Sequence, residues 1–207
     1  MKAGMILCGG MSQRMGQDKS SLLLGGQPLL CVQLERLTQC VDQCVVVAGP
    51  SQTLPELPRG VQLVRDEQLG QGPLAALERG MSHLPGNVDR LLLCGVDAPL
   101  LQPKLGVWLL QQLDTDDSGQ AWGACVLWDR PRWHPMPASY HVRILPELRA
   151  LLKRGERSLS QMLECIPVRV CSTDDIKQRD PELLSYLSAN TPAEFAQLKE
   201  RFASLHR

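Results

Sequence analysis

The stretch from Met5 to Lys19 limits what this chain can fold into more than any other part of its sequence. An apolar run ends at the adjacent glycines Gly9 and Gly10, and a polar segment with two cations and a third glycine follows. Adjacent residues without a Cβ let the backbone turn sharply and bring its N–H groups close to a ligand. Converging amides with cations at their rim bind phosphate. The stretch therefore predicts a loop that binds a nucleoside triphosphate after the first strand of an α/β domain, with Arg14 and Lys19 as its cations.

Two other glycine-rich phosphate-binding motifs do not fit this stretch. The Walker loop has its lysine directly after a glycine, whereas two residues separate Gly16 from Lys19 here. The dinucleotide fingerprint needs one residue between its first two glycines, whereas Gly9 and Gly10 are adjacent. The loop must therefore belong to another class of nucleotide-binding site.

Short apolar runs alternate with helical patterns along most of the chain, as in βαβ units around a mostly parallel sheet. A continuous β-branched run such as Val45–Val47 is typical of a strand covered on both faces. We therefore expect a Rossmann-like three-layer αβα sandwich. Strands are expected at 4–7, 22–24, 45–48, 61–64, 91–94, 121–127, 138–140 and 168–170, and helices at 28–40, from Pro73 onward, and at 104–113, 146–153, 159–164 and 192–206. Trp133–Pro137 is expected to be a proline-stiffened segment before the strand at 138–140.

Length and composition favour one domain with a substantial core. The chain has 207 residues, of which 43% are hydrophobic, and it contains no linker rich in glycine and serine. Its 22 basic and 22 acidic side chains cancel, which argues against a nucleic-acid or membrane-surface protein. The first residues do not resemble a signal peptide, and no apolar run approaches the ~20 residues of a membrane span. We expect a cytoplasmic protein.

The eight cysteines lie mostly inside apolar runs and form no C-x-x-C pair. They are expected to be reduced and to pack as small hydrophobic side chains. Cys40 and Cys44 could in principle bind zinc together with His83, but their spacing matches no common zinc site.

Two carboxylates are expected at strand ends, where open α/β sheets bind their ligands. Asp97 follows the leucine-rich run 91–94 and lies between Gly95 and Pro99. Beside a triphosphate it would bind Mg²⁺, which favours one or two carboxylates together with phosphates and waters; alternatively, it caps the next turn. Asp66 could accept hydrogen bonds from the N1–H and amino group of guanine, bind a ribose hydroxyl, or start a turn.

The loop also carries a family resemblance. The pattern L-x-G-G-x-S-x-R-M-G-x-D-K, which begins at Leu7, resembles the signature of nucleotidyltransferases that build sugar and cofactor nucleotides, and most of all the molybdenum cofactor guanylyltransferases of the MobA type. The resemblance covers nearly the whole chain. Further segments similar to that family are Gly72–Leu77, Cys94–Pro99, His134-Pro135, Gly155–Arg157 and Asn190–Pro192.

The resemblance implies a nucleotide-diphospho-sugar transferase-like fold that transfers GMP from GTP to molybdopterin, giving molybdopterin guanine dinucleotide and pyrophosphate. Within the one domain we expect a nucleotide-binding half at about 1–115 and an acceptor-binding half at about 116–207, and we expect a monomer with transient contacts to molybdoenzymes or their chaperones. Mg²⁺ would be the cofactor, with Asp97 as its ligand. Implied catalytic residues are Arg14, Lys19 and Asp97, and implied nucleotide-binding residues are Leu7, Cys8, Gly9, Gly10, Arg14, Lys19, Asp66 and Asp97.

The chain departs from the family pattern at several positions. Cys8 replaces an alanine, Ala76 a glycine and Ser188 an asparagine. Ala48 stands where an asparagine commonly contacts the nucleotide, which puts one nucleotide contact in doubt but not the class of reaction. His134, Arg157 and Asn190 are candidates for pterin contacts from their positions alone.

Two alternative functions remain open at this point. One is a cytidylyltransferase that acts on the same cofactor, although Gly9-Gly10 and Gly72–Ala75 favour GTP. The other is a non-catalytic carrier of GTP or molybdopterin, which the substitution at Ala48 suggests. A serine or cysteine hydrolase is disfavoured because the chain lacks a G-x-S-x-G elbow.

Overall fold

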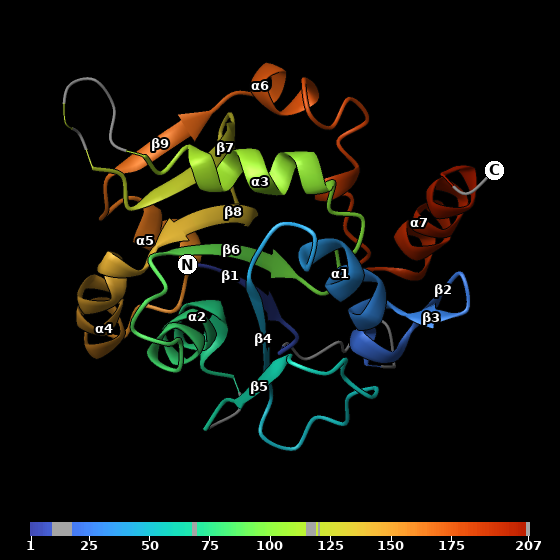
Figure 1. The fold of residues 1–207 in the computed structure, drawn as a ribbon, viewed down its shortest axis with the longest axis horizontal. Helices are drawn as coiled ribbons and strands as arrows, with labels where there is room; N and C mark the ends of the chain where they lie inside the picture. Colours follow the sequence, from blue (N-terminus) through green and yellow to red (C-terminus); the bar gives the residue numbers. More distant parts are fainter. Residues whose placement is uncertain (10–17, 68–69, 115–118, 120, 206–207) are drawn as a thin grey trace.

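A computed structural model describes residues 1–9, 18–67, 70–114, 119 and 121–205. Within these residues, seven strands form one twisted sheet in the order β5-β4-β1-β6-β8-β7-β9 (Figure 1). The strands of this sheet are β1 (Lys2–Leu7), β4 (Gln43–Ala48), β5 (Gln62–Arg65), β6 (Arg90–Gly95), β7 (Ala124–Asp129), β8 (Arg132–His141) and β9 (Val168–Cys171). A separate small hairpin pairs β2 (Leu23–Leu24) with β3 (Gln27–Pro28).

The strands on the β5 side of the sheet are all parallel, so their carboxyl ends meet at one edge. β1 lies between β4 and β6 and is parallel to both, and β5 is parallel to β4. β8 runs antiparallel to β6 and to β7, whereas β9 is parallel to β7. The expected three-layer α/β fold with a mostly parallel sheet is therefore confirmed.

Helices cover both faces of the sheet (Figure 1). α1 (Leu29–Leu37), α3 (Pro103–Gln111), α6 (Thr173–Lys177) and α7 (Pro192–Ser204) contribute buried residues to one hydrophobic cluster. α2 (Gly72–Ser82), α4 (Leu145–Lys153) and α5 (Leu159–Leu163) contribute to the cluster on the other face. Side chains alternate between the two faces along each strand; in β1, Ile6 belongs to the first cluster and Met5 to the second.

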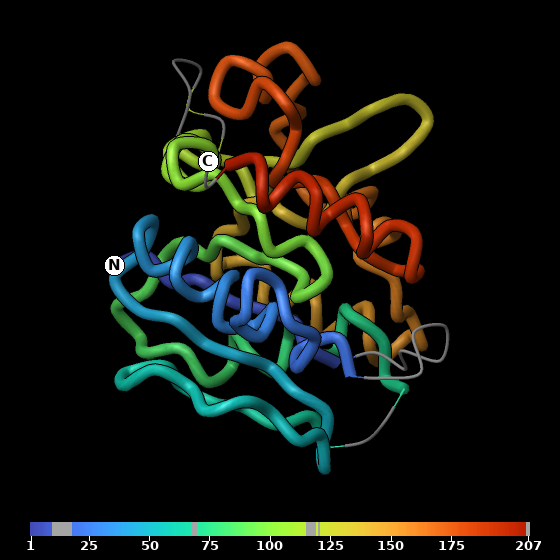
Figure 2. The backbone as a smooth tube through the Cα atoms, turned by 90° about the vertical axis from the view of Figure 1, so that its right-hand side faces the viewer, coloured from blue at the N-terminus to red at the C-terminus, as the bar shows by residue number. Residues whose placement is uncertain are grey.

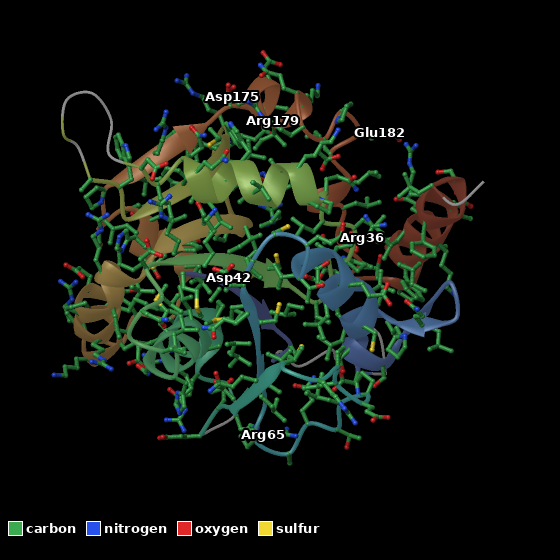
Figure 3. The ribbon with its side chains drawn as sticks, in the orientation of Figure 1. Arg36, Asp42, Arg65, Asp175, Arg179 and Glu182 are labelled. Atoms are coloured by element: carbon green, nitrogen blue, oxygen red, sulfur yellow. The ribbon has the colours of Figure 1, made fainter. Side chains whose placement is uncertain are left out.

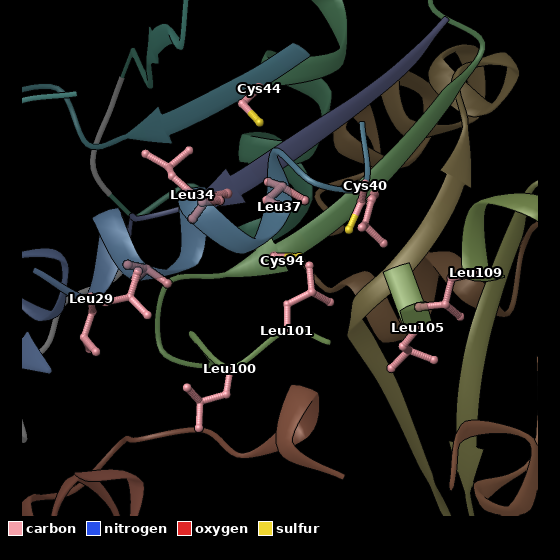
Figure 4. Close-up of a cluster of buried hydrophobic side chains, with 14 of the residues drawn as sticks. Leu29, Leu34, Leu37, Cys40, Cys44, Cys94, Leu100, Leu101, Leu105 and Leu109 are labelled. Atoms are coloured by element: carbon pink, nitrogen blue, oxygen red, sulfur yellow. The ribbon is translucent and has the colours of Figure 1, made fainter. Parts of the chain in front are cut away.

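Most of the cysteines pack as small hydrophobic side chains, as expected. Cys40, Cys44 and Cys94 lie among the leucines of α1 and α3 (Figure 4). Burial raises the pKa of the Cys40 thiol to about 11 and that of Cys44 to about 12, so both remain neutral. Cys8, Cys125 and Cys171 are buried as well, whereas Cys31 is half-buried and Cys165 is exposed.

The expected strand at 138–140 was too short, because β8 begins at Arg132 and includes the proline-stiffened segment. Proline cannot donate to a strand ladder and is tolerated at bulges. Pro135 and Pro137 lie where the register of β7 and β8 shifts, opposite the stretch between Cys125 and Leu127. The hairpin that β7 and β8 form extends away from the body of the fold (Figure 2).

Two helices also differ from expectation. α1 ends at Leu37 rather than near Cys40. α6 was not expected, although Ser172 and Asp175 form a capping box at its start. Thr191 and Pro192 begin α7 as expected, again with a capping box.

In the part of the chain that the structure describes, no helix is both long and apolar enough to cross a membrane.

The packing of β1 against α1 leaves no room for a side chain at Gly4. A Cβ there would lie 2.5 Å from Cγ of the fully buried Leu37. We expect Gly4→Ala to lower the free energy of unfolding by about 1–3 kcal/mol through overpacking, measured by chemical denaturation. Gly86→Ala is the matched control, because a Cβ on Gly86 would meet no atom within 4 Å. Recovery of part of the loss in Gly4→Ala/Leu37→Val would identify Leu37 as the clashing group, and a neutral Gly4→Ala would contradict the packing argument.

Candidate functional site

The carboxyl ends of β1, β4, β5 and β6 are held together by backbone hydrogen bonds. The Cys8 amide donates to the Val47 carbonyl (2.8 Å), and the Val96 amide donates to the Leu7 carbonyl (3.2 Å). The Asp66 amide donates to the Ala48 carbonyl (2.8 Å). These bonds place the chain segments that follow four separate strands along one edge.

The start of the glycine loop lies at this edge. Leu7 and Cys8 are buried, whereas Gly9 is exposed, and a Cβ on Gly9 would lie 3.4 Å from Oδ2 of Asp66. Burial raises the pKa of the Cys8 thiol, and the nearby Asp18 adds to this effect. Cys8 is thus a neutral core residue whose backbone reaches the site. Gly10 and Arg14 lie outside the described residues.

The structure brings Lys19 and Asp97 together. Lys19 begins a short 3₁₀ helix, η1 (Lys19–Ser21), and its Nζ lies 3.5 Å from Oδ2 of Asp97. The same Nζ donates a hydrogen bond to Oδ1 of Asn190 (2.7 Å). The Lys19 side chain is only 16% exposed and that of Asp97 30%, so the pair is less screened by solvent than a surface ion pair. The two side chains that the sequence singled out therefore lie side by side, while their catalytic and metal-binding roles stay predictions.

Asp97 takes its position from the turn that follows β6. A Cβ on Gly95 would lie 2.6 Å from Oδ1 of Asp97, so the carboxylate folds back over the strand end only because residue 95 is glycine. The Ala98 amide closes the turn on the Gly95 carbonyl (3.2 Å). The Asp97 carbonyl accepts from the Ala189 amide (2.9 Å), which attaches the segment before α7 to the site.

Asn190 is oriented by that segment. Its backbone amide donates to Oε2 of Glu194 (2.7 Å), and its Nδ2 donates to Oγ of Ser188 (3.2 Å). The hydrogen bond from the Asn190 amide contributes most to lowering the pKa of Glu194, against the effect of burial. The side-chain oxygen of Asn190 is therefore aimed at Lys19. Its contact with this lysine was not predicted, because it joins the two ends of the chain.

Asp66 lies beside a cavity of about 260 Å³. Burial raises the pKa of its carboxyl, and the neighbouring Arg79 lowers it in part. Arg79 also forms an ion pair with Glu67 (2.8 Å). The cavity is lined by Asp66, Glu67, Gln71, Ala75, Glu78 and Arg79.

Arg157 and His134 have structural contacts of their own. The Arg157 carbonyl accepts from the Leu74 amide near the start of α2 (3.3 Å). The His134 ring meets Tyr186 edge-on with a centroid distance of 5.8 Å. Burial, and then Arg132, lower the pKa of His134, so it is mostly neutral at pH 7. Their roles toward a pterin stay predictions.

One residue of the site was missed from the sequence. Gln52 follows β4, and its side-chain amide contacts the carboxylate of Asp18, the residue before Lys19 (2.8 Å to Oδ2). No motif marks Gln52, because the contact depends on how the turn after β4 folds.

The donor chemistry of this edge fits a divalent cation that prefers oxygen. Among the described residues, no cluster of three or more His, Cys, Asp or Glu side chains is suited to holding a metal. Mg²⁺ does not need one, because one or two carboxylates suffice when phosphates and waters complete its shell. Asp97 supplies such a carboxylate.

Known proteins resemble this chain in both sequence and fold. A family model described as "MobA-like NTP transferase domain" matches residues 4–169. A probable molybdenum cofactor guanylyltransferase from Mycobacterium avium is 34% identical over 165 residues, which cover 78% of this chain and 80% of that protein. Molybdopterin-guanine dinucleotide biosynthesis protein A from Archaeoglobus fulgidus has a similar fold, with a TM-score of 0.77 and 22% identity over 99% of this chain and 100% of that one. Rv0371C from Mycobacterium tuberculosis, solved in complex with manganese, has a TM-score of 0.63 and 16% identity over 96% and 98%.

The raised pKa of Asp66 predicts a pH-dependent cost to stability. Its folded pKa lies above the ordinary aspartate value of about 3.9, so the ionised carboxylate destabilises the fold at pH values above its raised pKa. The cost fades as pH falls from there to about 3.9 and is absent below it. We expect Asp66→Asn to raise the midpoint of thermal unfolding at pH 7, slightly because solvent screens the group, and to lose this advantage near pH 3.

Asp175→Asn is the control of opposite sign. Hydrogen bonds from Ser172 lower the pKa of Asp175, so its ionised form stabilises the fold. That stabilisation is present above the ordinary aspartate pKa and is lost as pH falls through the lowered folded value. Asp175→Asn should therefore lower the midpoint at pH 7. If the thermal unfolding midpoint of Asp66→Asn at pH 7 were equal to or below that of the wild type, the raised pKa of Asp66 would be contradicted.

Proposed function

This chain belongs to the family of MobA-like NTP transferases, and from that premise we propose that it joins the GMP moiety of GTP to molybdopterin, with release of pyrophosphate. The product is molybdopterin guanine dinucleotide. The observation that carries the proposal is the meeting of Lys19 and Asp97, 3.5 Å apart, at the edge where the glycine loop begins. A cation that offsets phosphate charge, next to a carboxylate that can bind Mg²⁺, supports transfer from a nucleoside triphosphate.

Backbone and cations hold the triphosphate. The backbone amides from Gly9 onward would bind the phosphates, and the buried Leu7 and Cys8 anchor Gly9 to the end of β1. Lys19 and Arg14 offset the negative charge that develops on the departing pyrophosphate. Asn190, which accepts a hydrogen bond from Lys19, keeps that ammonium in place.

Asp97 is the proposed ligand of Mg²⁺. A bound Mg²⁺ would neutralise phosphate charge and orient the phosphates for attack. Lys19 holds the Asp97 carboxylate at the strand end, so the ligand is positioned in advance. The fold neighbour solved with manganese supports a divalent cation in a protein of this fold.

The chemistry needs positioning more than proton transfer. The terminal phosphate of molybdopterin attacks the α-phosphorus of GTP; a new P–O bond forms, the bond between the α-phosphorus and the bridging oxygen breaks, and pyrophosphate leaves with that oxygen. Because the nucleophile is already anionic, no general base is required. Alignment of the two substrates and neutralisation of their charges lower the barrier.

Selectivity for GTP is assigned to the edge near Asp66. As an acceptor, its carboxylate fits either the N1–H and amino group of guanine or a ribose hydroxyl. The neighbouring segment Gly72–Ala75 starts α2, and its resemblance to guanylyltransferases favours GTP over CTP. We propose that the protein acts in the cytoplasm as a monomer, with transient contact to molybdoenzymes or their chaperones.

Release of pyrophosphate tests the reaction directly. With purified protein, molybdopterin and Mg²⁺, we expect pyrophosphate with GTP and little with CTP or ATP. Faster release with CTP would make the protein a cytidylyltransferase. Binding of GTP without pyrophosphate release when molybdopterin is present would make it a carrier.

Variants of the ion pair test the assigned roles. Lys19→Ala and Asp97→Ala should each lower kcat/KM for GTP by about a hundredfold, because each removes one electrostatic contact to the reacting phosphates. The control is Lys153→Ala, which removes an exposed lysine in the last turn of α4. Near-normal turnover in either site variant would overturn its role.

A further inference from the structure

The side chain of Gln52 connects three segments that meet at the carboxyl edge of the sheet. Its Oε1 accepts from the Gly49 amide (3.0 Å), directly after β4. Its Nε2 donates to the Cys8 carbonyl at the end of β1 (3.2 Å) and to both carboxylate oxygens of Asp18 (3.0 and 2.8 Å). A half-buried amide with all these partners in place is a rigid connector, since moving it would break several hydrogen bonds at once.

The backbone that carries Gln52 is itself held in place. Arg65, at the end of β5, donates from NH1 to the carbonyls of Gly49 and Gln52 (2.8 and 2.7 Å). Figure 3 labels this arginine, below β5 and beside the segment that leads away from β4. The backbone amide of Gln52 also donates to the Gly49 carbonyl (3.3 Å). The turn after β4 is thereby fixed to β5, and Gln52 reaches from a fixed base toward Asp18.

Asp18 transmits this constraint to Lys19. Its Oδ1 accepts from the amide of Ser20 (2.9 Å) and from its hydroxyl (2.6 Å), which caps η1. Ser20 is fully buried. The Asp18 carboxylate is thus held by Ser20 on one side and by Gln52 on the other. The next residue, Lys19, then extends to Asn190 and Asp97.

We infer that Gln52 is a positioning residue for nucleotide transfer, which acts through Asp18 to set where Lys19 meets the triphosphate. The inference rests on the proposed function for what Lys19 does, but it concerns a side chain that makes no assigned contact to substrate. Its contacts point to one consequence. Loss of the side-chain amide of Gln52 removes one set of hydrogen bonds to the Asp18 carboxylate. The η1 helix and the backbone of Lys19 then move relative to the strand ends.

The first test is Gln52→Ala. We expect kcat/KM for GTP to fall by about tenfold to a hundredfold, as for lost hydrogen bonds to a charged group, while the melting temperature stays within a few degrees of wild type. KM for molybdopterin should change little. The control is Gln62→Ala, because Gln62 lies at the opposite end of β5, and the one hydrogen bond recorded for its side chain among the described residues is to the His83 carbonyl (3.4 Å).

A second set of variants tests the route through Asp18. Gln52→Glu replaces a donor with a like charge and should lower kcat/KM more than Gln52→Ala does. In the double variant Gln52→Glu/Asp18→Asn, the new amide at position 18 can donate to the new carboxylate at position 52. We therefore expect kcat/KM to be about tenfold higher than in Gln52→Glu alone. Gln52→Ala/Asp18→Ala should be no worse than Asp18→Ala alone, because residues in one network act non-additively.

The outcomes separate this inference from the proposed function. Affinity for GTP with Mg²⁺, measured without molybdopterin, should fall in Gln52→Ala even if the wild-type protein releases no pyrophosphate. In that case the transfer reaction fails and the positioning role stands. Gln52→Ala with GTP affinity and kcat/KM within twofold of wild type, or additive effects of the Gln52 and Asp18 substitutions, would overturn the inference.

Discussion

The contact between the Lys19 ammonium and the Asp97 carboxylate organises this protein. It joins the first βα connection to the turn after β6, and Asn190 brings the beginning of α7 to the same point. The segments that follow these strands meet at one edge because β6, β1, β4 and β5 are neighbours with their carboxyl ends together. A parallel sheet turns residues that are remote in sequence into one row of strand ends.

The charged side chains of this edge are held in place by contacts within the protein. Lys19 is satisfied by Asp97 and Asn190, and the carboxylate of Asp18 by Ser20 and Gln52. Under the proposed function, a triphosphate would exchange partners around groups that are already oriented, so little side-chain entropy would be lost on binding. Asp66 is the exception, since burial disfavours its charged form and Arg79 only partly offsets this. A carboxylate kept at such a cost to stability is characteristic of binding sites.

Much of this fold could be predicted from local patterns. The buried strands β1, β4 and β6 are apolar runs that end at glycine or turn residues, and α7 begins with a recognisable cap. The β8 strand could not be predicted in full, because its prolines are compatible with a strand only at the irregular pairing with β7. The proximity of Lys19 and Asp97 could be predicted, because each belongs to a motif that follows a strand. Gln52 could not, since its role depends on contacts with Cys8 and Asp18 that only the folded chain creates.

The contacts of Gln52 bear on the alanine at position 48, where the family pattern has an asparagine. Ala48 is fully buried, and its carbonyl accepts from the Asp66 amide, so the end of β4 contributes only backbone to the edge. The side-chain amide that this strand end lacks is supplied by Gln52, from the turn that follows. Gln52 faces the base of the glycine loop and the residue before Lys19 rather than open solvent. The polar side chain after β4 therefore contacts Cys8, Gly49 and Asp18 in this chain, and under our proposal it holds Lys19 in place.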